Sequence, residues 1–222
     1  MSATASDRYG LNQIGYTTLV ISVFFLVLCI IAVSLRLWTR MIIKVSFGID
    51  DWLITASGFI YAGFCANILV GVFTIGGGQT YADPSVKAQK ETHYLQSEYV
   101  IYVLYGLNIT AIKLSILFLY LRIFGSVDSF RKAAHAIIAI CLLWFVAAIT
   151  GNILYCRPVQ RFWDSTVQGS CFDFATFFLI MELADMIIDA AIIGLPMKTI
   201  LGLRLSLRKR LGLLGIFVLG AL

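Results

Sequence analysis

Four ionisable residues lie inside long apolar stretches of the sequence. Lys113 lies in the segment Asn108-Ile-Thr-Ala-Ile-Lys113-Leu-Ser-Ile-Leu, and a later stretch holds Glu182, Asp185 and Asp189. Offsets of three and four residues place these three acids on one face of a helix. An unpaired charge in apolar surroundings costs about 2.5 kcal/mol or more, so such residues pair with each other or face water. A lysine with carboxylates can then form an ion pair, bind a ligand or carry protons.

The composition predicts that lipid surrounds the elements that position these residues. Of the 222 residues, 60% are apolar and 13% are charged, and the mean hydropathy is +0.91. A soluble domain is closer to about half apolar and about a quarter charged, so a soluble protein is excluded. A helix needs about 20 apolar residues to cross a bilayer. Five segments meet this length: Thr17–Leu37, Trp52–Ile75, Tyr99–Leu121, Ala133–Leu154 and Phe172–Leu195.

The predicted fold is an all-α, multi-pass transmembrane bundle with five full spans. A sixth apolar segment, Leu211–Leu222, is too short to cross, since it would reach only about 18 Å as a helix. The prediction treats residues 1–222 as one membrane domain. Within it, residues 17–222 form the bundle and residues 1–16 form a short extracellular N-terminus.

The distribution of Lys and Arg predicts the orientation. Eleven of the 17 lie in loops after the odd-numbered spans, and five lie on the opposite side. Because cytoplasmic loops carry the excess of Lys and Arg, the N-terminus is expected outside the cell, in the plasma membrane. The net charge of +5 is therefore a topology signal and does not indicate nucleic acid. The basic segment Arg204–Arg210 would attract anionic lipid or, alternatively, bind a cytoplasmic signalling partner.

Depth in the membrane predicts which ionisable residues meet. Lys113 would lie about 12 Å from the inner boundary, Asp189 about 10 Å, and Asp185 about one turn higher. We therefore expect Lys113 to pair with Asp185 or Asp189. Three interpretations remain: an ion pair that fixes helix packing, a polar cavity that senses a ligand or ion, and a proton or ion path. A retinal Schiff base on Lys113 is a further formal option, but no neighbouring residue indicates retinal.

The five cysteines suggest one covalent link. Cys29, Cys65 and Cys141 lie inside spans, whereas Cys156 and Cys171 flank an outer loop. A disulfide between Cys156 and Cys171 would contribute about 3 kcal/mol, and two free thiols are the alternative. No Cys/His spacing resembles a metal site, and no nucleophile and base pair in water-accessible surroundings. The sequence therefore predicts neither a metal, nor a cofactor, nor an enzyme.

A second group of charges is expected at the inner membrane face. Asp50 and Asp51 precede Trp52 at the start of the second span, where acids cap and anchor a helix. The alternative is that they pair with Arg36 or Arg40, which end the first span, and switch between states. Arg122, at the end of the third span, completes this predicted inner-face charge cluster.

The order of motifs resembles the fungal rhodopsin-domain integral membrane proteins, a family of seven-helix proteins of filamentous fungi. The family includes GPCR-like, pathogenicity-type receptors and members encoded beside secondary-metabolite pathways. The strongest match is Lys113-Leu-Ser-Ile-Leu-Phe-Leu-Tyr-Leu-Arg122-Ile-Phe124. The other matching pieces, in order, are Arg36 and Arg40 with Asp50-Asp51-Trp52-Leu53, Gly76–Gly78, Trp144, Cys156-Arg-Pro158 with Trp163 and Cys171, Asp189, Leu195-Pro196, Gly215 and Phe217–Gly220.

Two positions depart from the family pattern. Gln79 stands where the family often has His, and Asp185 stands where it often has Asn. The resemblance implies a GPCR-like sensor of an unknown small ligand, in which the basic loops report to a cytoplasmic partner. A transporter or an accessory membrane component of a secondary-metabolite pathway is the alternative, and a non-functional fragment is the third. The word rhodopsin here labels a fold and implies no retinal chemistry.

Overall fold

The computed structural model describes residues 13–73, 84–164 and 166–202, and the described part is all-α with one small hairpin. Its α-helices are α2 (Gln13–Ile42), α3 (Ile49–Phe73), α4 (Pro84–Phe124), α5 (Asp128–Ile153) and α6 (Phe174–Gly202). The hairpin pairs strands β1 (Cys156–Arg157) and β2 (Ser170–Cys171), and the short helix η1 (Val159–Phe162) lies in the loop between them.

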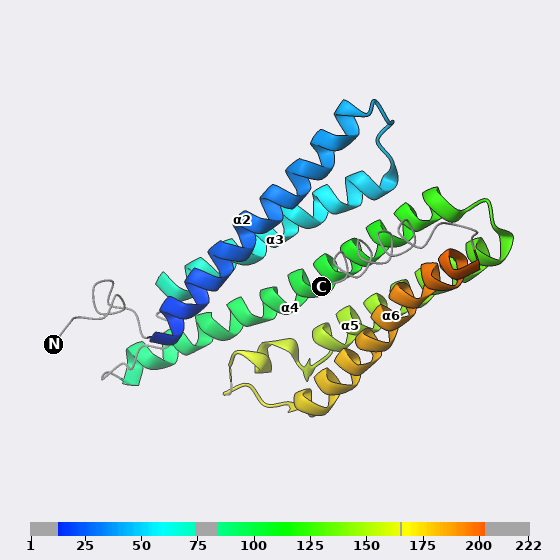
Figure 1. The fold of residues 1–222 in the computed structure, drawn as a ribbon. Helices are drawn as coiled ribbons and strands as arrows, with labels where there is room; N and C mark the ends of the chain where they lie inside the picture. The colour runs from blue at the N-terminus through cyan, green and yellow to red at the C-terminus, as the bar shows by residue number, and fades with distance from the viewer. Residues whose placement is uncertain (1–12, 74–83, 165, 203–222) are drawn as a thin grey trace.

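Helix α4 is the central helix of the described bundle. Figure 1 shows α2 and α3 on one side of it and α5 and α6 on the other. Helix α4 packs against α3, α5 and α6, whereas α2 packs mainly against α3. A third of the most apolar stretch of α4 is buried, against 6% of the corresponding stretch of α2. Any change in the position of α4 therefore reaches both sides of the molecule.

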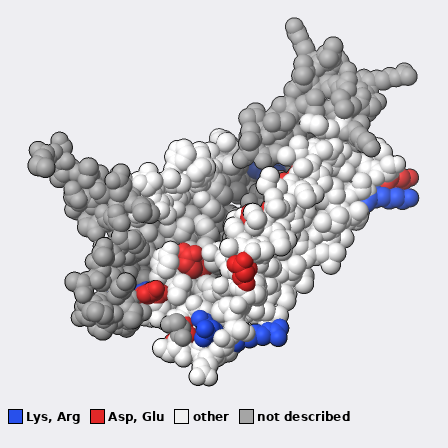
Figure 2. Space-filling view, turned by 90° about the horizontal axis from the view of Figure 1, so that it is seen from below, with Lys and Arg blue, Asp and Glu red and all other residues white. Residues whose placement is uncertain are grey.

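The structure supports a helical membrane protein. Among the described residues, four helices are long and apolar enough to cross a bilayer, over Gly15–Ile42, Ile49–Val72, Lys90–Phe124 and Asp128–Ile153. Their outward side chains are large and apolar; Trp52 is 72% exposed and Phe59 is 76% exposed. On the face drawn in Figure 2, most of the described surface is uncharged, and charged atoms form small separate groups. Helix α6, expected as the fifth span, carries three acids and is not among the four.

Several helices are longer than the apolar pattern predicts, and α4 and α6 show this most clearly at one end. Helix α4 begins at Pro84, well before the predicted start at Tyr99. Hydropathy misses this extension because it is rich in Lys, Gln and Glu, which are nevertheless good helix formers. At 41 residues, α4 is about 60 Å long and exceeds the hydrocarbon core. Helix α6 likewise continues past Leu195, through Pro196, to Gly202.

A tight connection joins α2 to α3. The amide of Val45 donates to the carbonyl of Arg40 at 3.2 Å, and the amide of Lys44 donates to that of Met41 at 3.2 Å. Lys44 has a φ of 53°, the left-handed conformation that closes a helix in this type of C-terminal cap. The backbone carbonyl of Gly48 then accepts from the backbone amide of Asp51 at 3.1 Å, and this bond forms the first turn of α3. The chain thereby reverses within a few residues.

The main hydrophobic core lies between α4, α5 and α6. Its buried members include Leu117 on α4, Ala134 and Cys141 on α5, and Ile188 and Ile192 on α6. This packing holds the polar residues of α4 and α6 at fixed positions inside the bundle. Several predicted features lie outside the described residues, namely Gly76–Gly78, Gln79, Arg204–Arg210, and the short sixth segment Leu211–Leu222 with its motifs.

Candidate functional site

The structure brings Lys113 of α4 against two acids of α6. The Nζ atom of Lys113 lies 2.6 Å from Asp185 Oδ1 and 2.9 Å from Asp189 Oδ1. The sequence predicts a pair with one of these acids, whereas the structure shows contact with both. The side chains of Lys113 and Asp185 are 7% and 9% exposed, but that of Asp189 is 51% exposed. One buried ammonium is thus shared between a buried and a half-exposed carboxylate.

Helix α5 closes the other side of this site. The Trp144 ring lies 5.8 Å from Lys113 Nζ, a distance at which a ring attracts a cation. The indole Nε1 of Trp144 donates to the backbone carbonyl of Met181 on α6 at 3.0 Å. Trp144 therefore links α5 to α6 and also shields the ammonium. It acts as a positioning residue for Lys113.

The third acid, Glu182, lies apart from the lysine. Its carboxylate accepts a hydrogen bond from the Tyr105 hydroxyl of α4, at 3.2 and 3.3 Å. A small cavity of about 30 Å³ lies beside this pair, lined in part by Trp144 and Gly106. That volume suits about one water molecule. The Lys113 site, defined as Lys113, Glu182, Asp185 and Asp189, thus has one cation and three acids on α4 and α6.

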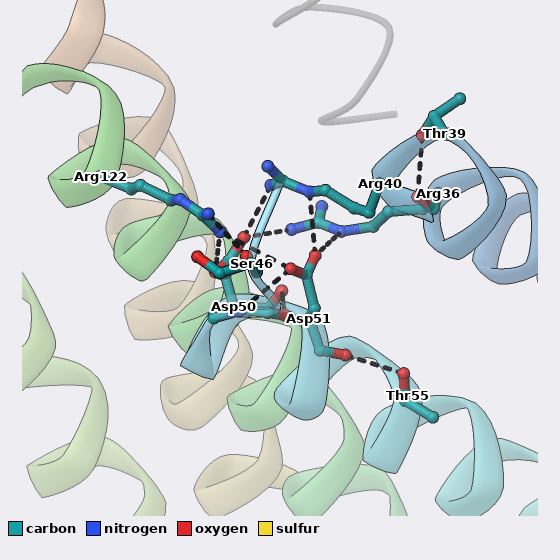
Figure 3. Close-up of polar contacts among 10 residues, drawn as sticks. Arg36, Thr39, Arg40, Ser46, Asp50, Asp51, Thr55 and Arg122 are labelled. Atoms are coloured by element: carbon teal, nitrogen blue, oxygen red, sulfur yellow. Dashed lines mark hydrogen bonds and ion pairs between the residues drawn. The ribbon is translucent and has the colours of Figure 1, made fainter. Parts of the chain in front are cut away.

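The charges predicted for the inner membrane face form one network, which we call the arginine–aspartate cluster (Arg36, Arg40, Asp50, Asp51 and Arg122). Figure 3 shows the three guanidinium groups converging on the two carboxylates. Arg36 contacts Asp50 at 2.9 Å and Asp51 at 3.1 Å. Arg40 contacts the same two acids at 3.0 and 3.3 Å. Arg122 reaches them at 3.5 and 3.7 Å, so the cluster connects α2, α3 and α4.

Backbone hydrogen bonds fix this cluster in place. The amide of Gly48 donates to Asp51 Oδ2 at 3.2 Å, and Arg122 Nη2 donates to the carbonyl of Ser46 at 2.7 Å (Figure 3). The hydroxyl of Ser115, which is fully buried on α4, donates to the carbonyl of Asp50 at 2.7 Å. The acids were expected first as caps of the helix and alternatively as partners of arginine. The structure places them in ion pairs, with a single amide contact at Asp51.

One turn of α4 serves both polar regions. Lys113 points to α6, and Ser115, two residues later, points to α3. Two residues correspond to about 200° around a helix, so the two side chains leave α4 on nearly opposite sides. A rotation or shift of α4 at this turn would alter the contacts of both regions together.

The remaining predicted pair lies in the connection between α5 and α6. Cys156 and Cys171 form a disulfide that closes the hairpin β1–β2. Aromatic residues next to the cysteines pack on one another; Tyr155 lies 5.1 Å from Phe172 and 5.4 Å from Phe162 between ring centroids. In the same loop, Thr166 donates to Asp164 from its hydroxyl and its amide and lowers the pKa of this exposed carboxyl.

Sequence reasoning missed Tyr105 and Ser115 as members of these regions. The signal for Tyr105 was present in the register. Helices α4 and α6 run in parallel, and Lys113 contacts Asp189. Because Glu182 lies seven residues before Asp189 on α6, its partner is expected about seven residues before Lys113 on α4. Ser115 carried no such signal, because its partner is a backbone carbonyl. Among the described residues, no group of His, Cys, Asp and Glu is arranged to hold a metal ion.

Comparison with known proteins places this arrangement in context. Residues 35–222 match the model of the fungal rhodopsin domain. A satratoxin biosynthesis cluster protein of Stachybotrys chartarum is 31% identical over 119 residues, which cover 53% of this chain and 44% of that protein. A polyenoic acids biosynthesis gene cluster protein, Ba17b of Metarhizium anisopliae, is 28% identical over 218 residues, which cover 94% of this chain and 57% of that protein.

A protein named Receptor GIN3, from Arthrobotrys oligospora, is 28% identical over 205 residues, covering 88% of this chain and 47% of that protein. The chain spans about half the length of the curated relatives it matches. No solved structure matches it.

Proposed function

We propose that this chain, which belongs to the fungal rhodopsin domain family, is a receptor-like sensor of the plasma membrane with its N-terminus outside the cell. In this proposal an external small ligand shifts α4, and the basic inner loops report the shift to a cytoplasmic partner. The chain catalyses no reaction and needs no cofactor for this role. The relative named Receptor GIN3 supports a receptor, and the contacts of α4 suggest how it would work.

The observation that carries the proposal is the shared turn of α4. Lys113 contacts Asp185 and Asp189 on one side, while Ser115 holds the backbone of Asp50 on the other. Lys113 has two acceptors of different exposure, so a shift of α4 would redistribute its contacts between a buried and a half-exposed carboxylate. A ligand that moves α4 would change this balance and also strain the contacts of α4 with the arginine–aspartate cluster. A bistable contact of this kind is what coupling between distant sites requires.

The same proposal assigns α6 as the fifth crossing of a seven-helix architecture. Its 29 residues span about 43 Å, which exceeds the hydrocarbon core. The acids that weaken its apolar signal have partners: Asp185 and Asp189 contact Lys113, and Glu182 accepts from Tyr105. The hairpin with the disulfide then lies outside the cell, where thiols oxidise.

The test separates sensing from simple packing. Fungal cells would carry the wild-type chain, Lys113→Met or Lys113→Arg at equal levels in the membrane, and transcript changes would be measured after exposure to fractionated fungal culture extracts. We expect a response with wild type, its loss with Lys113→Met, and partial retention with Lys113→Arg, which keeps the charge. Equal responses from all three variants would contradict the proposal.

A second candidate is a transporter or accessory membrane component of a secondary-metabolite pathway. It is favoured by the relatives named as biosynthesis cluster proteins and by the three acids along one face of α6. Vesicles that contain the purified chain would then accumulate a pathway product in a manner that depends on Asp185. Flux that Asp185→Asn abolishes, without any transcript response, would favour this candidate over the sensor.

A further inference from the structure

A separate cavity lies between α2, α3 and α4, away from both polar regions. Its volume is about 440 Å³, which is within the range of small-molecule sites in proteins. It lies where α2 begins and α3 approaches its end, so it occupies the end of the bundle that we propose to be external. Most of its lining is apolar, with Phe64 and Ile68 of α3 among the larger side chains.

Among the described residues that line the cavity, Glu98 of α4 is the one that carries a charge. Tyr94, one turn before Glu98 on α4, also lines the cavity. A carboxylate offers about four acceptor positions, so Glu98 can accept hydrogen bonds from the donors of a ligand. The rings of Tyr94 and Phe64 also line the cavity and would attract a cation.

Glycine makes room for a ligand in this cavity. At Gly71 of α3, an added Cβ would meet only Ser97 Oγ, at 3.8 Å. A larger side chain at this position would therefore extend into the empty volume. Ser97 donates to Asn67 Oδ1 at 2.5 Å, so its hydroxyl links α4 to α3 beside the cavity.

We propose that this cavity binds a small free amine, protonated on nitrogen and carried on a compact apolar body. The ammonium would donate to Glu98 and lie near the ring of Tyr94, while the apolar body would fill the space beside Phe64 and Ile68. A neutral molecule of the same shape would leave the carboxylate without a charged partner, and the carboxylate would repel an anionic one. The inference deepens the proposed sensor by naming its ligand class, and rests on that function only for its biological meaning.

The test uses the rigid amine 1-aminoadamantane as the probe. Tritiated probe would be measured by equilibrium dialysis against the full chain in uncharged dodecylmaltoside micelles, with empty micelles subtracted. We expect saturable binding at one site and a loss of about tenfold or more with Glu98→Gln, because Gln keeps an acceptor oxygen but lacks the charge that strengthens a hydrogen bond from an ammonium. The matched control is Glu91→Gln, which removes an exposed acid from the same helix and should leave affinity unchanged.

Two further arms do not depend on the fate of the Glu98 variant. Gly71→Leu should reduce binding at least as strongly by filling the cavity, with melting temperature and elution volume checking the fold. The alcohol 1-adamantanol, which has the same cage without the charge, should compete about tenfold less well than the amine and be indifferent to Glu98→Gln.

Four outcomes would overturn the proposal. These are no saturable binding of the amine, equal losses with Glu98→Gln and Glu91→Gln, equal competition by amine and alcohol, and displacement of the probe by lysophosphatidylethanolamine. The last would assign the cavity to the ammonium of a lipid headgroup. The binding test does not measure signalling. A failure to bind the amine therefore leaves the sensor proposal intact, and the lack of a transcript response leaves the binding result intact.

Discussion

The two polar regions of this molecule have opposite balances of charge and exposure. In the arginine–aspartate cluster, two carboxylates that are at most 3% exposed are shared by three guanidiniums that are 19–30% exposed. At the Lys113 site, one ammonium that is 7% exposed is shared by two carboxylates, and one of these is 51% exposed. The surplus charge is therefore positive and partly solvated in the first region, and negative in the second.

This difference suggests different roles. Arginine stays protonated in proteins and contacts carboxylates through a rigid fork, and backbone groups of Ser46, Gly48 and Asp50 add further bonds to the cluster. The cluster is therefore suited to holding three helices together. Lys113 instead has two acceptors of different exposure, and a carboxylate can be neutralised by a proton. The Lys113 site is suited to changing its contacts.

The largest expected effect is that of removing the one cation of the Lys113 site. Lys113→Met leaves Asp185 buried without its partner, and we expect a loss of about 3 kcal/mol in the free energy of unfolding. The double variant Lys113→Met with Asp185→Asn removes the uncompensated charge and should recover more than half of this loss. Unfolding by sodium dodecyl sulfate in mixed micelles would measure both. A double variant no more stable than the single one would show that the lysine acts through packing alone.

Removing one carboxylate of the arginine–aspartate cluster should cost less. Asp51 is 1% exposed, but the arginines that it contacts can reach solvent, so we expect Asp51→Asn to cost about 2 kcal/mol. The control is Asp128→Asn, which breaks an exposed pair with Arg131 at 2.7 Å and should cost about 0.5 kcal/mol or less. Thermal unfolding of the two variants compares the costs directly. Equal costs would remove the distinction between a buried cluster and a surface pair.

The sequence predicted the helices and the chemistry of both regions better than their geometry. Counting residues from the ends of apolar segments placed Lys113 at the depth of Asp185 and Asp189, because a helix has a constant rise per residue. The same counting did not show that the ammonium contacts both acids, since that depends on how α4 and α6 rotate against each other. The start of α4 at Pro84 was missed because hydropathy measures lipid exposure and not helix propensity.

Contacts that involve the backbone were the least predictable. Whether Asp50 and Asp51 cap α3 or pair with arginine depends on the left-handed turn at Lys44, and no side-chain pattern encodes that turn. The bond from Ser115 to the carbonyl of Asp50 joins residues that are 65 positions apart. Nothing in the type of either residue specifies the other, so only packing of α3 on α4 reveals the contact.

The two acids that share Lys113 should differ when each is neutralised. Asp185 is buried and accepts from Lys113 at 2.6 Å, so we expect Asp185→Asn to cost about 1.5 kcal/mol. Asp189 is half exposed on a helix that we propose to cross the bilayer, where a carboxylate is costly, so neutralising it offsets part of the lost contact and Asp189→Asn should cost only about 0.5 kcal/mol. Unfolding of the two single variants under the same conditions provides the measurement. The reverse order would mean that Asp189 is the main partner of the lysine.

The smallest expected effect is that of relieving backbone strain at Lys44, and it tests which of the two polar regions this turn stabilises. The left-handed conformation at Lys44 costs a non-glycine residue about 1–2 kcal/mol. Glycine avoids this cost, but it loses more conformational entropy on folding, which offsets part of the gain. Lys44→Gly should therefore stabilise the protein by about 0.5 kcal/mol, whereas Lys44→Ala, which retains the strain, should not. Because variants in one network are coupled most strongly, the gain should combine non-additively with Asp51→Asn and closer to additively with Lys113→Met, which reaches the turn only through α4. Stronger coupling to Lys113→Met than to Asp51→Asn in a double-mutant cycle would mean that the turn supports the Lys113 site instead.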